Sequence, residues 1–259
     1  MLSQKNFFRF AVFCGIFPLF ACSDDSGNKD DTGDIFSGLP NQVYLREIDP
    51  DAAWDEDREI ISEYKGNAEV KLVLRGPLDY DTDRFLYVDT LLGGKIENGK
   101  ITVNLPISVE SRFLEPFNGN CAGNEEESES CESDVSFPKN LTTTSFGWIM
   151  LYAAIPGKEN LCPLHLRSGS SDEPQGYNSA GVLYASTSGK IKGIRTLTNS
   201  YYKESFVSDY DVNISMGWNM LYSNYKRYND ADEITVYYTL ISKDKKILTT
   251  GLEWQARCR

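Results

Sequence analysis

Apolar and polar residues alternate along much of the chain beyond residue 67, and a period of two limits the chain to folds built from strands. The clearest stretch is residues 94–106, GKIENGKITVNLP, in which Ile101, Val103 and Leu105 share one face. Asn98 and Gly99 between its two halves can supply the two positive φ angles of a type I′ turn. The stretch therefore predicts a β-hairpin.

Further strands are predicted at 68–74, 146–154, 180–185, 189–195, 210–214, 217–222, 233–241 and 247–254. Segments 180–185 and 189–195 flank three short polar residues and predict a second hairpin. The run 146–154 is apolar throughout and fits a buried strand, or less readily a helix. The only helical candidate is the acidic stretch 52–64. Turns about every ten residues predict an all-β fold, a mainly antiparallel β-sandwich or barrel with one or two β subdomains.

The first 22 residues have the layout of an export signal. Lys5 and Arg9 precede an apolar run at 10–20, which is shorter than the roughly 20 residues of a membrane-spanning helix. The run ends in Leu-Phe-Ala-Cys at 19–22, which resembles the lipobox of bacterial lipoproteins. The resemblance implies cleavage before Cys22, acylation of that cysteine and a lipid anchor in the membrane. Ser23 at the next position implies the outer membrane of a diderm bacterium; the alternative is an ordinary secretory signal cut near Ala21.

Composition after Cys22 divides the chain further. Residues 22–40 hold five aspartates and few apolar groups, which predicts a disordered tether after the signal peptide 1–21. We expect an N-terminal β region at 41–117, an acidic loop at 118–138 and a C-terminal β region at 139–259. The net charge is −12 and no basic stripe is present, which excludes nucleic acid as a partner.

Four cysteines follow Cys22, and four cysteines in an exported chain predict two disulfides with three possible pairings. We favour Cys121–Cys131, which closes a local acidic loop, and Cys162–Cys258, which ties the chain end to its middle. Free thiols or a metal site are the alternatives. With no CxxC pair and a single histidine, we expect no zinc.

Catalytic signatures are scarce. His165 is the only histidine, and no serine stands in a nucleophile elbow, so no catalytic residue is predicted. Asp79–Asp83 begins like a calcium loop, but Arg84 and Thr90 occupy the positions that require glycine and glutamate. A solvated acidic turn is the favoured interpretation there and a looser calcium site the alternative. We expect no metal and, without a phosphate-binding glycine loop, no cofactor.

Four motifs resemble a pattern found in uncharacterised bacterial lipoproteins: GGKIENGKITVNLP, AGVLYASTSGKIKG, YDVNISMGWNMLY and GLEWQAR. This resemblance implies an all-β extracytoplasmic protein and brings no activity with it.

Aromatic residues are numerous, with 15 tyrosines, 13 phenylalanines and 4 tryptophans, and rings on a β surface can contact sugars. Tyr225, Tyr228 and Trp54 are the candidate ligand-binding residues, whereas Trp148 and Trp218 are expected in the core. We therefore predict a non-catalytic binding or structural module whose partner is a polysaccharide or an envelope protein. The alternative is an envelope glycoside hydrolase, or another hydrolase, that uses an unidentified pair of carboxylates.

Overall fold

The computed structural model describes residues 35–48, 59–76, 78–79, 84–117, 119, 121, 129–144, 150–168, 176–229, 234–242 and 251–258. All of them belong to one compact unit, Thr32–Arg259. Cys22 and Trp54 lie outside the described residues, as do the predicted signal peptide and most of the tether. Among the described residues, no helix has the length and apolar character needed to cross a membrane.

The regular structure of the described residues consists of strands and one 3-10 turn, Ser111–Phe113. The strands are β1 Val43–Ile48, β2 Glu59–Glu63, β3 Ala68–Arg75, β4 Leu78–Asp79, β5 Arg84–Phe85, β6 Val88–Glu97, β7 Lys100–Val103, β8 Glu115–Pro116, β9 Glu129–Ser133, β10 Thr142–Thr143, β11 Leu151–Ala154, β12 Cys162–Arg167, β13 Tyr177–Ala185, β14 Gly189–Asn199, β15 Glu204–Ile214, β16 Gly217–Asn229, β17 Thr235–Ser242 and β18 Glu253–Cys258.

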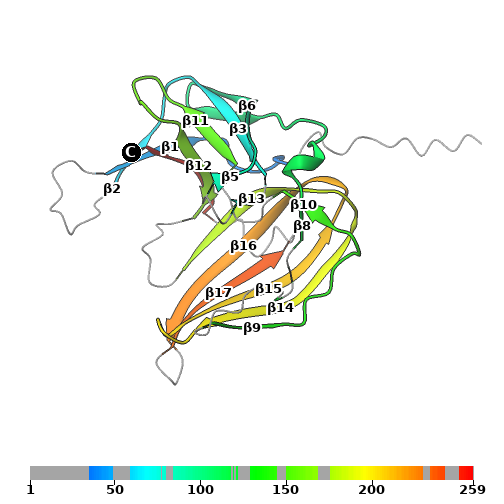
Figure 1. The fold of residues 1–259 in the computed structure, drawn as a ribbon. Helices are drawn as coiled ribbons and strands as arrows, with labels where there is room; N and C mark the ends of the chain where they lie inside the picture. The colour runs from blue at the N-terminus through cyan, green and yellow to red at the C-terminus, as the bar shows by residue number, and fades with distance from the viewer. Residues whose placement is uncertain are drawn as a thin grey trace, which may run out of the picture. The chain divides into compact units, whose positions relative to one another are not determined.

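Sixteen of these strands belong to one sheet, whose main order is β7-β6-β3-β11-β12-β13-β16-β17-β15-β14-β9. β18, β1 and β2 extend the sheet from β12, and β10 and β8 extend it from β13. The β15–β17 and β1–β18 pairs are parallel, and the other pairs are antiparallel. Figure 1 shows β13, β16, β17, β15 and β14 as long neighbouring arrows. The fold is all-β and mainly antiparallel, as predicted. An isolated antiparallel bridge also joins Gln42, next to β1, to Lys100 of β7.

The predicted hairpin at 94–106 is confirmed as β6 and β7. Asn98 and Gly99 have φ angles of 51° and 78°, the two positive values of the expected turn. A side chain at Gly99 would place its Cβ 1.8 Å from the carbonyl oxygen of Tyr64. Glycine is required here by both the backbone angle and the close approach of a second segment.

The second predicted hairpin is wrong. β13 pairs with β16 along its whole length, whereas β14 pairs with β15 and β9. Between them, Ser186 donates its N–H to the carbonyl of Thr142 and accepts from the Thr142 N–H with its hydroxyl. Each strand has a longer partner elsewhere in the sheet, so the short connection joins two strands that are not neighbours.

Two other segments differ from expectation. In the helical candidate 52–64, residues 59–63 form β2, antiparallel to β1, and the remainder up to residue 58 lies outside the described part. Ile60 and Ile61 are both about half exposed, so pairing with β1 rather than side-chain burial holds this segment in its extended conformation. In the acidic segment 118–138, residues 129–133 form β9 along the edge of β14, where backbone hydrogen bonds outweigh the polar composition.

Buried apolar side chains form two clusters on opposite sides of β13 and β16. The first draws on β3, β6, β11, β12 and β18 and includes Leu72, Leu164, Trp218, Tyr222 and Trp254. The second includes Phe117, Leu141, Leu183, Val212, Leu221 and Ile241. Successive residues of β16 alternate between the clusters, as the period of two requires. Trp218 is in the core, as expected, and Trp148 lies outside the described residues.

Both favoured cysteine pairs are joined in the structure. The S–S distances are 2.11 Å for Cys121–Cys131 and 2.06 Å for Cys162–Cys258. Strands from both expected β regions pair with each other, since β3 pairs with β11 and β1 with β18. The two regions therefore share one sheet.

Candidate functional site

Four aromatic rings form a row across neighbouring strands of the long-stranded part of the sheet. Tyr177 of β13 stacks on Tyr225 of β16 with ring centroids 4.9 Å apart. Tyr225 is 6.2 Å from Tyr237 of β17, and Tyr237 is 4.8 Å from Phe206 of β15. We call these four residues the aromatic ladder, and the side of β13 to β17 from which they project the ladder face.

Strand register produces the aromatic ladder. Tyr177 lies directly opposite Tyr225, and Phe206 lies directly opposite Tyr237 in the parallel β15–β17 pair. The middle step is diagonal, because Tyr225 lies opposite Thr239 of β17. The two short centroid distances match the spacing of about 4.8 Å between neighbouring strands. The spacing of the paired rings is thus set by the distance between neighbouring strands.

The rings are stacked rather than spread into one flat platform. The planes of Phe206 and Tyr237 differ by 12°, and those of Tyr177 and Tyr225 by 29°. Their facing surfaces are therefore occupied by each other, and ring edges are what they present to a ligand. Phe206 is 44% exposed and the three tyrosines are half-buried. The result is an accessible ridge of rigid amphipathic side chains.

Charged groups flank the aromatic ladder. The guanidinium carbon of Arg227 lies 5.7 Å from the Tyr237 ring centre, and that of Arg167 lies 5.9 Å from the ring centre of Tyr177. The Tyr237 hydroxyl donates to Glu204 Oε1 at 3.0 Å, which raises the pKa of Tyr237. Burial raises the pKa of Tyr225. Both phenols consequently keep their protons at neutral pH and can donate hydrogen bonds.

A cavity of about 220 Å³ adjoins the aromatic ladder where the sheet branches. β12 pairs with β13 only at Leu166–Ala180 and Arg167–Ser179, and its first residues pair with β11 instead. The backbone beyond Ala180 therefore lacks β12 as a neighbour. A Cβ added to Gly181 would meet nothing within 4 Å, so space is left over this part of β13.

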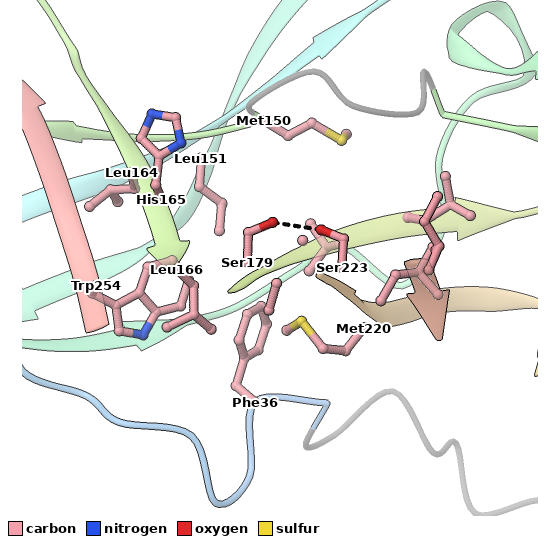
Figure 2. A pocket seen from close by; sticks show the side chains of 16 residues that line it. Phe36, Met150, Leu151, Leu164, His165, Leu166, Ser179, Met220, Ser223 and Trp254 are labelled. Carbon is pink, nitrogen blue, oxygen red and sulfur yellow. Dashed lines mark hydrogen bonds between the residues drawn. The ribbon is translucent and has the colours of Figure 1, made fainter. Parts of the chain in front are cut away.

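The cavity has an apolar side and a side continuous with the ladder face. Ser179 and Ser223 lie one strand period from Tyr177 and Tyr225 respectively, and their hydroxyls are 2.6 Å apart. Figure 2 shows this pair between the labelled Met150 and His165 and the labelled Phe36, Met220 and Trp254. The arrangement can hold a small apolar group beside a ligand that lies on the aromatic ladder.

His165 borders the cavity as a neutral group. Burial, together with the charges of Arg167, Arg257 and Arg46, lowers its pKa to about 4. Arg167 donates from Nε to Gln255 Oε1 at 2.7 Å, and both side chains are buried. No described serine or cysteine thiol donates a hydrogen bond to this imidazole, and Cys162 is in a disulfide. His165 is thus not part of a nucleophilic arrangement within the described residues.

The three residues singled out from the sequence have different positions. Tyr225 belongs to the aromatic ladder. Tyr228 is three residues later on β16, and an odd spacing along a strand places two side chains on opposite faces of the sheet. The side chain of Tyr228 is 50% exposed. Trp54 lies outside the described residues.

The sequence alone did not single out Tyr177, Phe206 or Tyr237 as candidate ligand-binding residues. A tyrosine or phenylalanine within an alternating segment is the only local signal for them. The pairing of β17 with both β15 and β16, which brings these rings together, joins segments distant in the chain.

Within the described parts of the chain, no three His, Cys, Asp or Glu side chains are grouped so that they could hold a metal ion. The predicted acidic turn at 79–83 is described only at Asp79. Comparison of the chain with protein-family models, with curated proteins and with solved structures gave no match.

Proposed function

We propose that this protein is a non-catalytic binding module of the cell envelope, anchored by a lipid at Cys22, which binds an extended polysaccharide along the aromatic ladder. The observation that carries the proposal is the row of four rings across β13, β16, β17 and β15. The lipid anchor rests on the lipobox resemblance alone, and metabolic labelling with a fatty acid tests it: a Cys22→Ser variant that still takes up label rules it out.

The chemistry of the ladder face suits a sugar chain. Sugars combine apolar C–H groups with many hydroxyls, and tyrosine edges offer both an apolar surface and a phenol. Ser208 and Thr239 lie on the same face between the rings and the second cluster. Because the rings are stacked, a ligand would find them already ordered, and little side-chain entropy would be lost on binding.

Hydrolysis is the second candidate, and the ladder face favours binding over it. Glycoside hydrolysis uses two carboxylates that flank the scissile bond. Among the described side chains on the ladder face of β13 to β17, Glu204 is the only carboxylate. It already accepts the hydrogen bond from Tyr237.

A pair of tyrosine variants on one strand tests the proposal. The full-length, oxidised protein in detergent is presented to a panel of insoluble polysaccharides and released with the soluble form of any that retain it. Tyr225→Ala should weaken retention about tenfold, because one ring of the row is lost.

Tyr228→Ala is the matched control, because it removes the same side chain from the opposite face of β16. Its retention should stay within about twofold of the natural protein. Equal losses in both variants, or no retention by any polysaccharide, would contradict binding at the aromatic ladder.

A further inference from the structure

Charge on the ladder face is opposite in sign to that of the whole chain. The chain carries a net charge of −12. On the ladder face of β13 to β17, the described charged side chains are Arg195, Arg227 and Glu204, which gives one net positive charge. A locally positive surface on an acidic protein attracts an anionic ligand to that surface.

Among the described residues, a ring contact rather than an ion pair holds Arg227 in place. Its guanidinium lies over the Tyr237 ring at 5.7 Å, and none of the described carboxylates forms a salt bridge with it. Glu204, which lies near the same ring, is engaged by the Tyr237 hydroxyl. The ring orients the guanidinium, and no described carboxylate competes with a ligand for its N–H groups.

Arg195 supplies a second guanidinium on β14, beside the other end of the aromatic ladder. It lies opposite Ser208. Burial raises the pKa of nearby Tyr210, and the hydrogen bond with Ser208 and the charge of Arg195 oppose that rise. The Nε of Arg195 is buried and has no hydrogen-bond partner among the described residues. A buried donor without a partner is unfavourable, so a movement of the side chain that lets this donor meet an oxygen of a ligand would be favourable.

The two arginines flank the Tyr237–Phe206 half of the aromatic ladder. β14 and β16 are separated by β15 and β17, which is three strand spacings, or about 14 Å between the two strands. One polymer lying across the strands would meet both guanidiniums. Guanidinium groups bind carboxylates and other oxyanions with paired, charge-assisted hydrogen bonds.

We infer that the ligand of the ladder face is an anionic polysaccharide whose acidic groups pair with Arg227 and Arg195. This inference rests on the proposed function and names the class of glycan. Carboxylate and sulfate groups share the required chemistry, and the experiment separates them.

The test measures binding of the full-length, oxidised protein in detergent by calorimetry. The probes are a polyuronate, the same polymer after reduction of its carboxyl groups to neutral alcohols, and a sulfated polysaccharide of similar length. The natural protein should bind the polyuronate or the sulfated polymer at least about tenfold more tightly than the reduced polymer, and more weakly as salt is raised. Whichever acidic polymer binds identifies the anion.

Arg227→Gln and Lys226→Gln form the matched pair of variants. Both remove one positive charge from adjacent residues of β16, but Lys226 is on the opposite face. Arg227→Gln should remove most of the tenfold preference for the acidic polymer, and adding Arg195→Gln to it should remove more of that preference. Lys226→Gln should change the preference less than about twofold.

The possible results distinguish a failure of the anionic-ligand inference from a failure of the proposed polysaccharide binding. Equal binding of the polyuronate and its reduced form would overturn the inference while leaving polysaccharide binding in place. Equal effects of Arg227→Gln and Lys226→Gln would show attraction by total charge and would also overturn it. Failure of every polymer to bind would overturn both.

Discussion

At the scale of single residues, the positive charges around His165 help to keep its imidazole neutral. Arg46 and Arg167 are 3% and 6% exposed, and both, with Arg257, disfavour a positive charge on the imidazole. Burial disfavours that charge further, and the pKa falls from 6.5 to about 4. The imidazole thus stays neutral in the folded protein throughout the mildly acidic range, whereas in the unfolded chain it takes up a proton.

This difference predicts a loss of stability in acid. Because the pKa is lower in the folded state, the unfolded state binds more protons between pH 6.5 and 4, and stability falls as pH falls through that window. The natural protein should lose about 2 kcal/mol more unfolding free energy than a His165→Gln variant between about pH 7 and pH 4.5. Urea unfolding at the two pH values measures this. Parallel pH profiles for the two proteins would show that His165 is not responsible.

The parity of a strand position decides what a side chain can do in this protein. Tyr225 and Tyr228 look equivalent in sequence, yet one stacks in the aromatic ladder and the other faces away. Arg227 and Lys226 differ in the same way. Adjacent variants on β16 are therefore natural controls for one another.

At the scale of elements, the aromatic ladder stabilises the pairing of the strands that carry it. Each cross-strand aromatic pair contributes on the order of 0.5–1 kcal/mol beyond its buried area. The ladder also fixes register, because a shift of one residue would send every ring to the other face. The same contacts that would hold a ligand thus help to align β13, β16, β17 and β15.

The β6–β7 turn offers a test of local backbone requirements. Gly99→Ala should lower the unfolding free energy by about 3 kcal/mol, since a left-handed φ costs a non-glycine residue about 1–2 kcal/mol and the new Cβ would also collide with the Tyr64 carbonyl. Gly157→Ala is the control, because Gly157 has a φ of 85° but a Cβ added there would meet nothing within 4 Å. It should cost only about 1 kcal/mol. Thermal or urea unfolding gives both values. Equal losses of unfolding free energy would show that the close approach of the Tyr64 carbonyl does not add to the cost of Gly99→Ala.

At the scale of the whole molecule, β12 joins the parts of the sheet. Its first residues pair with β11, its later residues pair with β18, and its last two also pair with β13. Cys162 at the start of β12 is bonded to Cys258 at the end of β18. This disulfide therefore fixes the branch point next to which the cavity lies.

The two disulfides should differ in their effect on stability. The separation is 96 residues for Cys162–Cys258 and 10 for Cys121–Cys131. Restricting the unfolded chain should contribute about 5 kcal/mol for the long loop and about 3 kcal/mol for the short one. Double Cys→Ser variants of each pair, unfolded in urea under oxidising conditions, give the two losses. A larger loss from Cys121–Cys131 would contradict this ranking.

Local sequence signals determined the all-β class, the β6–β7 turn and the approximate positions of most strands, because alternation and a positive-φ pair act over a few residues. They did not determine which strands are neighbours. The β13–β14 hairpin was wrong and β2 was missed because backbone pairing depends on which edges are available, and that is set by distant segments.

The candidate site shows the same division. The sequence by itself marked Tyr225 as a surface aromatic and favoured the two cysteine pairs that the structure joins. Only the tertiary structure set Tyr177 and Phe206 in one row with it and placed Arg227 beside that row, where no described carboxylate forms a salt bridge with it. The physical reason is that β17 inserts between β15 and β16, parallel to one and antiparallel to the other, which no pattern of neighbouring residues encodes.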